Sequence, residues 1–261
     1  MELALYSAAT GMEAQQLNLD VISNDMANVN TTAYKRTQNE FQDLMYQNVK
    51  PIGADSGDNT YAPTGIQLGN GTQLVSTTKI FTQGQLNRTG EELDVAIDGQ
   101  GFFEVNLPDG RTVYTRDGAL KVNADGKVVN SAGLEIGSGF QTIATARKGI
   151  AINANGTVSV DTVDNGMQSF KIQLAKFPNP SGLKSLGNNL YEATTASGEA
   201  TLGDASQDGY GSIRQYYLEM SNVNIVQSMV NMIIAQRAYE MNSKSVQTAD
   251  EMLSKVNQLK R

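Results

Sequence analysis

The sequence predicts an α+β protein in which long N- and C-terminal helices with heptad spacing form a coiled-coil core domain, while the chain between them forms a β-rich middle domain. Apolar residues recur at heptad spacing near both ends, and short β-rich runs alternate with turns in between. The length of 261 residues is sufficient for two domains. We expect a core helix over 1–34, a connecting segment with an extended loop over 35–65, a β-rich outer domain over 66–213, and a return segment with a second core helix over 214–261.

The first helix is predicted from a seam in which the steps alternate between three and four residues, as the a and d positions of a coiled coil require. The seam consists of Leu5, Ala8, Met12, Gln15, Leu19, Ile22, Met26 and Val29. Only Gln15 is polar. We expect the helix to end between Asn28 and Thr32, because Asn and Thr favour caps and turns.

The last helix is predicted over Asn224 to Arg261, a stretch without Gly or Pro. Its apolar rows are Ile225, Met232, Tyr239, Val246 and Leu253, and three residues further on Ala235, Ala249 and Val256, with polar Ser228 and Asn242. Asn224 and Gln227 form a plausible capping pair. One narrow apolar stripe on so long a helix requires a partner.

The two seams together predict a subunit interface. An amphipathic helix that packs on its own domain is the alternative for either helix alone. The interface residues are Leu5, Met12, Leu19, Ile22, Met26, Ile225, Met229, Met232, Tyr239, Val246, Leu253 and Val256.

In the connecting segment, the sequence predicts one or two helical turns over Glu40 to Gln47, followed by an extended loop over Pro51 to Gly65. The β-rich stretch has turn signals at regular intervals, which indicate antiparallel hairpins. Val122-Asn-Ala-Asp-Gly-Lys-Val128 is echoed by Ile152-Asn-Ala-Asn-Gly-Thr-Val158, as two similar hairpins would produce.

Composition excludes several classes of function. The net charge of −7 opposes binding to nucleic acid or to an anionic membrane. The chain has no His and no Cys, which removes His-dependent triads and the usual zinc ligands. No stretch approaches 18 apolar residues, and no basic N-terminal region precedes an apolar run. We therefore predict no catalytic, cofactor-binding or metal-binding residues, no membrane insertion and no cleaved signal peptide.

An enzyme that acts on polysaccharide through Asp94 and Asp98 is the alternative from another class, since paired carboxylates perform acid–base chemistry. The alternation with Val95 and Ile97 instead predicts a strand whose Asp94, Ala96 and Asp98 share the solvent side. This interpretation is favoured.

Three stretches resemble the bacterial flagellar rod and hook family. The first is similar to the family's Asn-Asn-Leu-Ala-Asn…Thr…Gly-Phe/Tyr-Lys signature, although Asp25 replaces the second Asn and Ala33 stands where Gly is frequent. Its matching residues are Asn24, Ala27, Asn28, Thr31, Tyr34 and Lys35. The second is Leu93 to Val105 with Tyr114-Thr-Arg-Asp-Gly118. The third begins at Ser221-Asn-Val-Asn224 and includes Gln236, Arg237, Tyr239 and Glu240.

This resemblance implies a structural axial subunit and not an enzyme. Such subunits stack into a helical tube with the terminal helices inside and the β domain outside. The implied partners are further copies of the chain, proximal rod and hook subunits, basal-body ring proteins and the flagellar export apparatus. The implied place is the periplasmic rod of the basal body. Phe41 and Met45 resemble an export motif, and a buried helical turn is the alternative for them.

Among members of the family, the chain is most similar to distal rod subunits, which form a rigid hollow shaft that transmits torque to the hook. It is short for a hook protein, and 46–65 resembles the extra segment of distal rod subunits. We expect that segment to clamp neighbouring subunits through Tyr46, Pro51, Ile52, Tyr61 and Pro63. A proximal rod or hook subunit, and a free coiled-coil adhesin, are the alternatives.

Overall fold

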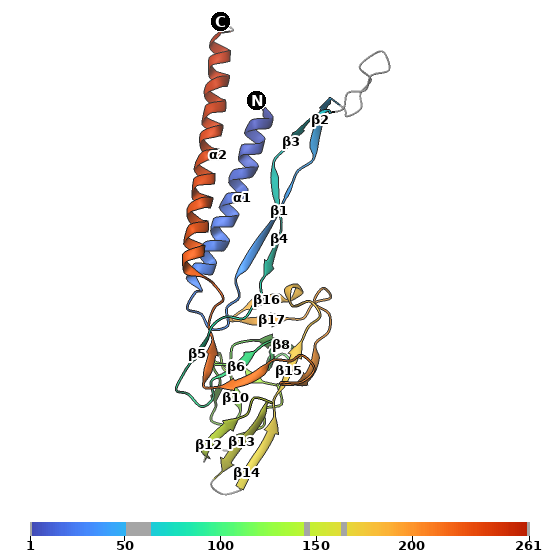
Figure 1. Ribbon diagram of the computed structural model, residues 1–261, viewed down its shortest axis with the longest axis vertical. Coiled ribbons are helices and arrows are strands. Elements are labelled where there is room, and N and C mark those ends of the chain that lie inside the picture. Colours follow the sequence, from blue (N-terminus) through green and yellow to red (C-terminus); the bar gives the residue numbers. More distant parts are fainter. Residues whose placement is uncertain (1, 51–63, 144–146, 163–165, 260–261) are drawn as a thin grey trace, which may run out of the picture. The chain divides into compact units, whose positions relative to one another are not determined.

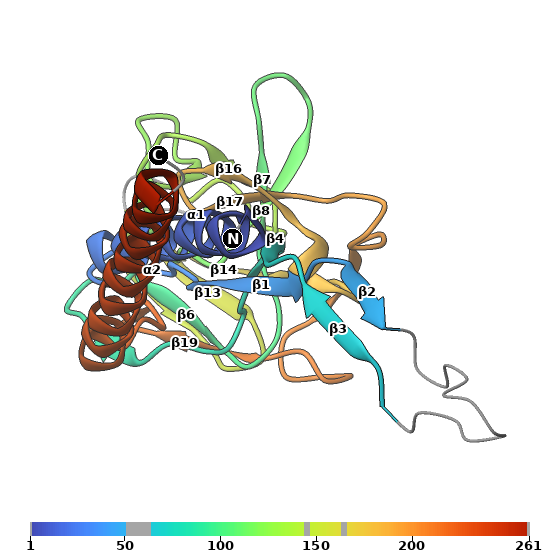
Figure 2. The ribbon, with the colours of Figure 1, turned by 90° about the horizontal axis from the view of Figure 1, so that it is seen from above.

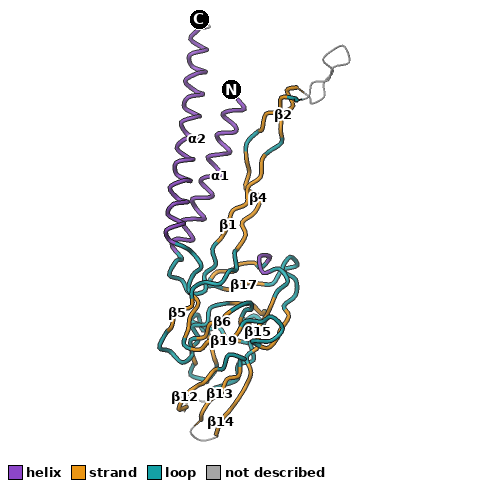
Figure 3. The backbone as a smooth tube through the Cα atoms, in the orientation of Figure 1, coloured by secondary structure: helices purple, strands orange, loops and turns teal. Residues whose placement is uncertain are grey.

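The computed structural model describes residues 2–50, 64–143, 147–162 and 166–259. The chain divides into two compact units. Unit 1 contains Met1–Met26, Thr37–Thr78 and Asn224–Arg261, and unit 2 contains Ala27–Arg36 and Lys79–Val223. Long helices lie at both ends of the chain and strands dominate the middle, as Figure 3 shows. The fold class is therefore α+β, as the sequence predicts.

Unit 1 consists of two long helices and a long hairpin (Figure 1). The helices lie side by side, and the hairpin is built from two pairs of strands, β1 with β4 and antiparallel β2 with β3. The elements are α1 (Glu2–Ala27), β1 (Thr37–Asp43), β2 (Tyr46–Lys50), β3 (Ile66–Gly69), β4 (Thr72–Lys79) and α2 (Ile225–Leu259).

Small residues let the other elements of unit 1 approach α1 closely. A Cβ atom on Gly11 would lie 2.8 Å from Nδ2 of Asn242 on α2. A Cβ atom on Gly71, in the hairpin, would overlap the hydroxyl of Thr10. The amide of Asn39 also donates to Oδ1 of Asn18 at 3.3 Å. The helix α1 thus has α2 on one side and the hairpin on another, as the view in Figure 2 also shows.

The start of α2 is capped by one of the two residues of the predicted capping pair. The side-chain Oδ1 of Asn224 accepts the backbone N–H of Gln227 at 3.1 Å, which satisfies one of the free donors in the first turn. The side chain of Gln227 donates to Asn231 at 3.0 Å instead of returning to Asn224. The cap is therefore half of the predicted capping box.

The connecting segment differs from its prediction. Residues 40–47 were expected to be helical, but Glu40 lies in β1 and Tyr46 begins β2. The reason is the partner strand β4, whose Ser76 and Thr78 hydroxyls donate to the Glu40 carboxylate at 3.0 and 3.1 Å. Pairing with a Thr-rich strand outweighs weak local helix propensity here. Of the predicted loop, 51–63 lies outside the described residues.

The described residues of unit 2 form short strands and one 3-10 turn, η1 (Pro180–Gly182). Its largest sheet has the order β16-β17-β8-β7-β11-β10-β9, a three-stranded sheet has the order β12-β13-β14, and three pairs are β15-β18, β19-β6 and β20-β5. The bounds are β5 (Leu86–Arg88), β6 (Val95–Asp98), β7 (Phe103–Asn106), β8 (Thr112–Thr115), β9 (Lys121–Val122), β10 (Val128–Val129), β11 (Glu135–Ile136), β12 (Arg147–Ile152), β13 (Thr157–Thr162), β14 (Gly166–Lys171), β15 (Gln173–Lys176), β16 (Lys184–Gly187), β17 (Leu190–Glu192), β18 (Thr201–Asp204), β19 (Ser212–Gln215) and β20 (Tyr217–Glu219).

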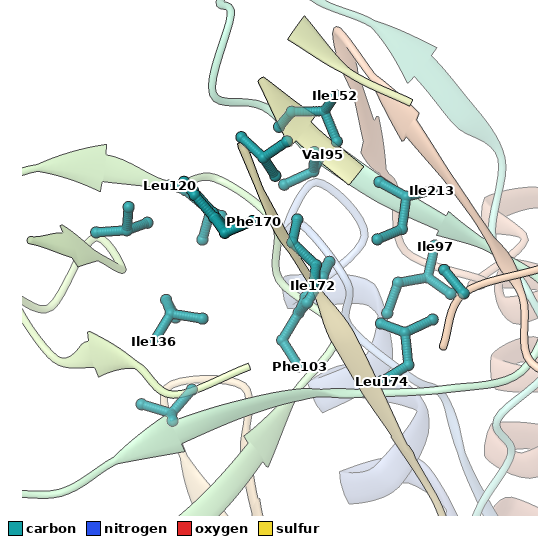
Figure 4. Packing of buried hydrophobic residues seen from close by; sticks show 14 of the residues in the cluster. Val95, Ile97, Phe103, Leu120, Ile136, Ile152, Phe170, Ile172, Leu174 and Ile213 are labelled. Atoms are coloured by element: carbon teal, nitrogen blue, oxygen red, sulfur yellow. The ribbon is translucent and has the colours of Figure 1, made fainter. Parts of the chain in front are cut away.

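The main core of unit 2 joins aliphatic side chains from several of these sheets (Figure 4). Val95, Ile97 and Phe103 are fully buried there, together with Ile172 and Leu174. Each such side chain contributes about 1.5–3 kcal/mol relative to an exposed position. This core packs the small sheets of unit 2 against one another.

The echoed sequences form matching hairpins, as predicted. In the first, Asn123 N–H donates to the Lys127 carbonyl at 3.0 Å, and in the second Asn153 N–H donates to the Thr157 carbonyl at 2.9 Å. Antiparallel pairing of β9 with β10 and of β12 with β13 follows these turns. The Asn130 N–H likewise donates to the Leu134 carbonyl at 2.9 Å. This is a third turn of the same kind, and the echo between the two sequences does not reveal it.

Candidate assembly surfaces

The predicted rows of α2 form its least exposed side. Ala235 and Ala249 are buried, and Met232, Val246 and Leu253 are half-buried. Asn242, in the same rows, is the residue that Gly11 of α1 approaches. The seam of α2 therefore has a partner within its own chain. On α1, Ala8 and Ile22 are buried, while Leu5, Met12, Leu19 and Met26 are half-buried.

A second apolar surface lies on the opposite side of α2. It consists of side chains that are 45–72% exposed, and we name it the α2 apolar face: Val226, Met229, Val230, Ile233, Ile234 and Met241. Val226 and Ala235 are nine residues apart, or roughly two and a half turns, so they point in opposite directions. The expectation of a single narrow stripe is therefore wrong. Three predicted interface residues outside this face, Ile225, Tyr239 and Val256, are also exposed.

The hairpin of unit 1 carries further exposed apolar side chains. Met45 is 84% exposed, and Val49, Ile66 and Leu68 are also exposed. Phe41 lies in β1 and is exposed, so the alternative of a buried helical turn for Phe41 and Met45 is wrong.

The predicted loop residues are only partly covered by the structure. Tyr46 is the first residue of β2 and is exposed. A hydrogen bond with Asp43 raises the pKa of its phenol. The remaining four, Pro51, Ile52, Tyr61 and Pro63, lie outside the described residues.

A buried ionic network occupies one edge of unit 2. The Lys35 ammonium donates to Glu219 Oε1 at 2.6 Å, and Nε of Arg116 donates to Glu219 Oε2 at 2.9 Å. The Arg116 guanidinium also donates to the carbonyls of Gly99 at 2.8 Å and Gly101 at 3.2 Å. All three charged side chains are almost fully buried. Glu219 was not singled out from the sequence, since no local pattern distinguishes it.

Two cations and one carboxylate share this site, so it carries a buried positive charge. Burial and the neighbouring Arg116 cation lower the pKa of Lys35 from 10.5 to about 8, although Glu219 opposes this shift. Burial alone would raise the pKa of Glu219, but Arg116 and Lys35 outweigh burial and hold it below its usual value of 4.5. The site therefore stabilises the ionised form of Glu219 and destabilises the protonated form of Lys35.

The other family-motif residues are spread over two places. After α1, the Thr31 hydroxyl donates to Asn28 at 3.2 Å, and the Lys79 ammonium lies 4.7 Å from the centroid of the Tyr34 ring. Ala33 has a φ of 56°, in the left-handed region that glycine adopts more easily. A glycine would therefore adopt this backbone conformation with less strain than Ala33 does. Asn24 and Ala27 are exposed near the end of α1.

On α2, Gln236, Arg237, Tyr239 and Glu240 are all exposed, and Arg237 pairs with Glu240 at 2.9 Å.

The two carboxylates of the enzyme alternative lie in different environments. Asp94 is only 8% exposed, and Asp98 forms an ion pair with Arg214 at 2.6 Å. Ala96 is fully buried, so the predicted solvent-facing row of Asp94, Ala96 and Asp98 is wrong. The strand β6 pairs with β19, and its consecutive residues Val95, Ala96 and Ile97 are all buried, so the strand is covered on both faces. Within the described ranges, no three His, Cys, Asp or Glu side chains are grouped to hold a metal ion. No described helix is long and apolar enough to span a membrane.

Comparisons with known families agree with the motifs. Residues 5–35 match the model "Flagella basal body rod protein". Residues 96–160 match "Flagellar hook protein FlgE/F/G D1 domain", and residues 214–259 match "Flagellar basal body rod FlgEFG protein C-terminal".

Full-length relatives carry the same description. The "Flagellar basal-body rod protein FlgG" of Borreliella burgdorferi is 44% identical over 264 residues, which cover 100% of both chains. The FlgG proteins of Caulobacter vibrioides and Bacillus subtilis are 44% and 35% identical, over 98% and 99% of this chain and 99% of each relative. With the motifs, the fold and these relatives in agreement along its whole length, the chain belongs to the family of flagellar basal-body rod proteins.

Proposed function

We propose that this chain is a structural subunit of the flagellar distal rod, which polymerises into a rigid hollow drive shaft and transmits torque to the hook. The observation that carries the proposal is the α2 apolar face. Six large apolar side chains stand exposed on one side of a helix whose other side already packs within the subunit. A contiguous surface of this kind marks a protein interface.

The energetics favour assembly through this face. Covering one such side chain contributes about 1.5–3 kcal/mol, and association costs about 4–15 kcal/mol. Because these six side chains are only 45–72% exposed, covering the whole face contributes about 5–11 kcal/mol, which is comparable with the cost of association. We further propose that the seam between α1 and α2 has coiled-coil packing, and that this pair lines the tube while unit 2 forms its outer layer.

The proposed partners follow from this role. They are further copies of the chain, proximal rod and hook subunits at the two ends of the shaft, and ring proteins around it. The proposed place is the periplasmic part of the basal body, reached through the flagellar export apparatus. Phe41 and Met45, both exposed on the hairpin, are the proposed export motif.

The hairpin is the proposed source of stiffness. Its exposed Met45, Tyr46 and Val49 are available to bind a neighbouring subunit. Deleting 51–63 is expected to leave the α2 apolar face and therefore polymerisation intact, while the polymer becomes curved or flexible in electron micrographs. Straight rods of unchanged stiffness would show that this segment is no clamp.

The proposal is tested by placing a charge on the α2 apolar face. In Ile234→Glu the subunit should fold normally, because Ile234 is exposed and surface substitutions change stability by about 0.5 kcal/mol or less. Rod formation and swimming should be lost, because each contact would bury a carboxylate. The matched control Gln247→Glu adds the same charge at an exposed polar position of α2 and should assemble. Normal rods from Ile234→Glu would refute this interface.

A further inference from the structure

Unit 2 contains a pocket whose walls are mostly aromatic rings and prolines. Its volume is about 240 Å³, and its apolar wall consists of Phe81, Phe102, Phe177, Pro178 and Pro180. All of these residues belong to unit 2. An engineered apolar cavity of about 150 Å³ is large enough to hold benzene. The pocket therefore has room for one aromatic ring and a short polar group.

The walls of the pocket are joined to one another without a ligand. Phe102 and Ala175 exchange two backbone hydrogen bonds, of 2.8 and 2.9 Å, which connect the wall at Phe102 with the segment that leads to Phe177. The Phe102 ring also meets the rings of Phe81 and Phe177 edge to face, with centroids 5.4 and 5.8 Å apart. The two prolines restrict the backbone of the remaining wall. A pocket that is already formed loses little conformational freedom when a ligand binds.

Arg116, which also lines the pocket, has a hydrogen-bond donor to spare. A guanidinium has five N–H groups. Within the described ranges, the acceptors of Arg116 are Glu219 at 2.9 Å and the carbonyls of Gly101, Ile97 and Gly99 at 3.2, 3.3 and 2.8 Å. One N–H is left for a ligand, on a side chain that is only 4% exposed. Because a buried donor without an acceptor is costly, this wall favours a ligand that brings an oxygen atom.

The pocket also has a positive wall, although the chain as a whole carries a net charge of −7. Arg116 shares the Glu219 carboxylate with Lys35, so this buried group has one cation in excess. Lys176 lines the pocket as a second cation, and its ammonium lies 5.8 Å from the centroid of the Tyr210 ring. No carboxylate of the described residues forms an ion pair with Lys176. Since apolar walls screen charge less than water does, this part of unit 2 attracts an anion.

We infer that the pocket is a binding site for a small aromatic carboxylate. The ring packs among Phe81, Phe102 and Phe177, and the carboxylate accepts charge-assisted hydrogen bonds from Arg116 and Lys176. A neutral aromatic molecule leaves the cations without an acceptor, and a bare anion leaves the rings uncovered. The site belongs to the single subunit, so it goes beyond the proposed function.

The test titrates the unassembled full-length protein with 3-phenylpropionate and follows the backbone amides by two-dimensional NMR. We expect saturable shifts at Gly101, Phe102 and Phe177. Two matched probes separate the contributions of charge and ring: 3-phenylpropanamide keeps the ring without the charge, and acetate keeps the charge without the ring. Each should bind about tenfold more weakly or worse, because the first loses charge-assisted hydrogen bonds and the second loses apolar burial.

Lys176→Met removes the ammonium and keeps most of the apolar stem. Its affinity for 3-phenylpropionate should fall about threefold to tenfold, since Lys176 is half-buried. Its affinity for 3-phenylpropanamide should not change. The matched control is Lys127→Met, which changes the net charge equally at an exposed residue that pairs with Glu135 and does not line the pocket. This variant should bind both probes as the unchanged chain does.

The inference is overturned if 3-phenylpropionate causes no saturable shifts at the three amides, or if either matched probe binds as tightly. It is also overturned if Lys127→Met weakens binding as much as Lys176→Met. None of these results depends on rod assembly, so the proposed function is tested separately.

Discussion

Lys35, Arg116 and Glu219 bury two cations against one carboxylate, which makes the carboxylate the critical group of the three. In Glu219→Gln both cations lose their countercharge. Removing one partner from a buried pair typically costs about 3–5 kcal/mol, and we expect a loss of this size in the free energy of unfolding, measured with urea. The control Glu192→Gln affects a carboxylate whose partner Arg111 is exposed, and it should cost about 1 kcal/mol or less. Equal effects would contradict the assigned role.

The same site predicts two pH dependences of stability. The pKa of Glu219 is held below 4.5 in the folded chain, so its contribution is fully present above that pH and is lost as the pH falls through the folded value. The pKa of Lys35 is lowered from 10.5 to about 8. Between these values the unfolded chain binds a proton that the folded chain has released, so the contribution of Lys35 rises with pH.

Comparison with Lys35→Met isolates the second effect. The difference in unfolding free energy between the unchanged chain and Lys35→Met should increase from pH 8 to pH 10.5, by up to about 3 kcal/mol, since one pKa unit corresponds to about 1.4 kcal/mol. Chemical denaturation at several pH values measures it. A constant difference over this window would mean that Lys35 titrates normally.

Gly118 is a residue whose role the sequence alone does not reveal. The stretch Tyr114-Thr-Arg-Asp-Gly118 resembles the family, but its residues alone do not say why a glycine ends it. The reason is tertiary, because a Cβ atom on Gly118 would overlap the backbone carbonyl of Val95. Backbone cannot yield as a flexible side chain can, so Gly118→Ala should destabilise unit 2 by about 1–3 kcal/mol or more. Gly90→Ala, where nothing lies within 4 Å of the added atom, should melt at nearly the unchanged temperature. Similar melting temperatures for both would contradict the packing described.

At the scale of elements, the two helices were predictable because the apolar period is long and strong. The strand β1 was not, because Phe41 is the one apolar residue in Thr37-Gln-Asn-Glu-Phe-Gln-Asp43, so the sequence shows no apolar alternation there. The strand forms by pairing with β4. The second apolar side of α2 was missed for a different reason. The heptad template selects one side of a helix, and Val226, Ile233 and Ile234 lie outside it.

The contact between α1 and α2 depends on the small residue at position 11. In Gly11→Leu the larger side chain would push against Asn242, since even a Cβ atom comes within 2.8 Å. We expect a loss of about 1–3 kcal/mol in unit 1 and defective assembly. Gln16→Leu adds a similar side chain at an exposed position of α1 and serves as the control. Helix melting followed by circular dichroism compares them, and unchanged melting in Gly11→Leu would indicate looser packing.

At the scale of the whole molecule, the family and the structural role followed from the sequence because the terminal motifs are local and specific in combination. The buried ionic network of unit 2 and the hydrogen bonds of Asn222 could not be predicted, because Lys35, Arg116, Glu219 and Asn222 meet their partners only in three dimensions. Two of the quoted motifs contain Arg116 and Asn222, but their spacing assigns no partner to either.

The central claim is that the chain is a rod subunit that assembles through the exposed side of α2. Electron cryomicroscopy of the polymer formed by the full-length protein tests it most directly. The account predicts straight hollow tubes in which α1 and α2 line the channel and Val226, Ile233 and Ile234 are covered by a neighbouring subunit. Tubes in which this face of α2 stays exposed to solvent, or polymers with unit 2 at the axis, would contradict it.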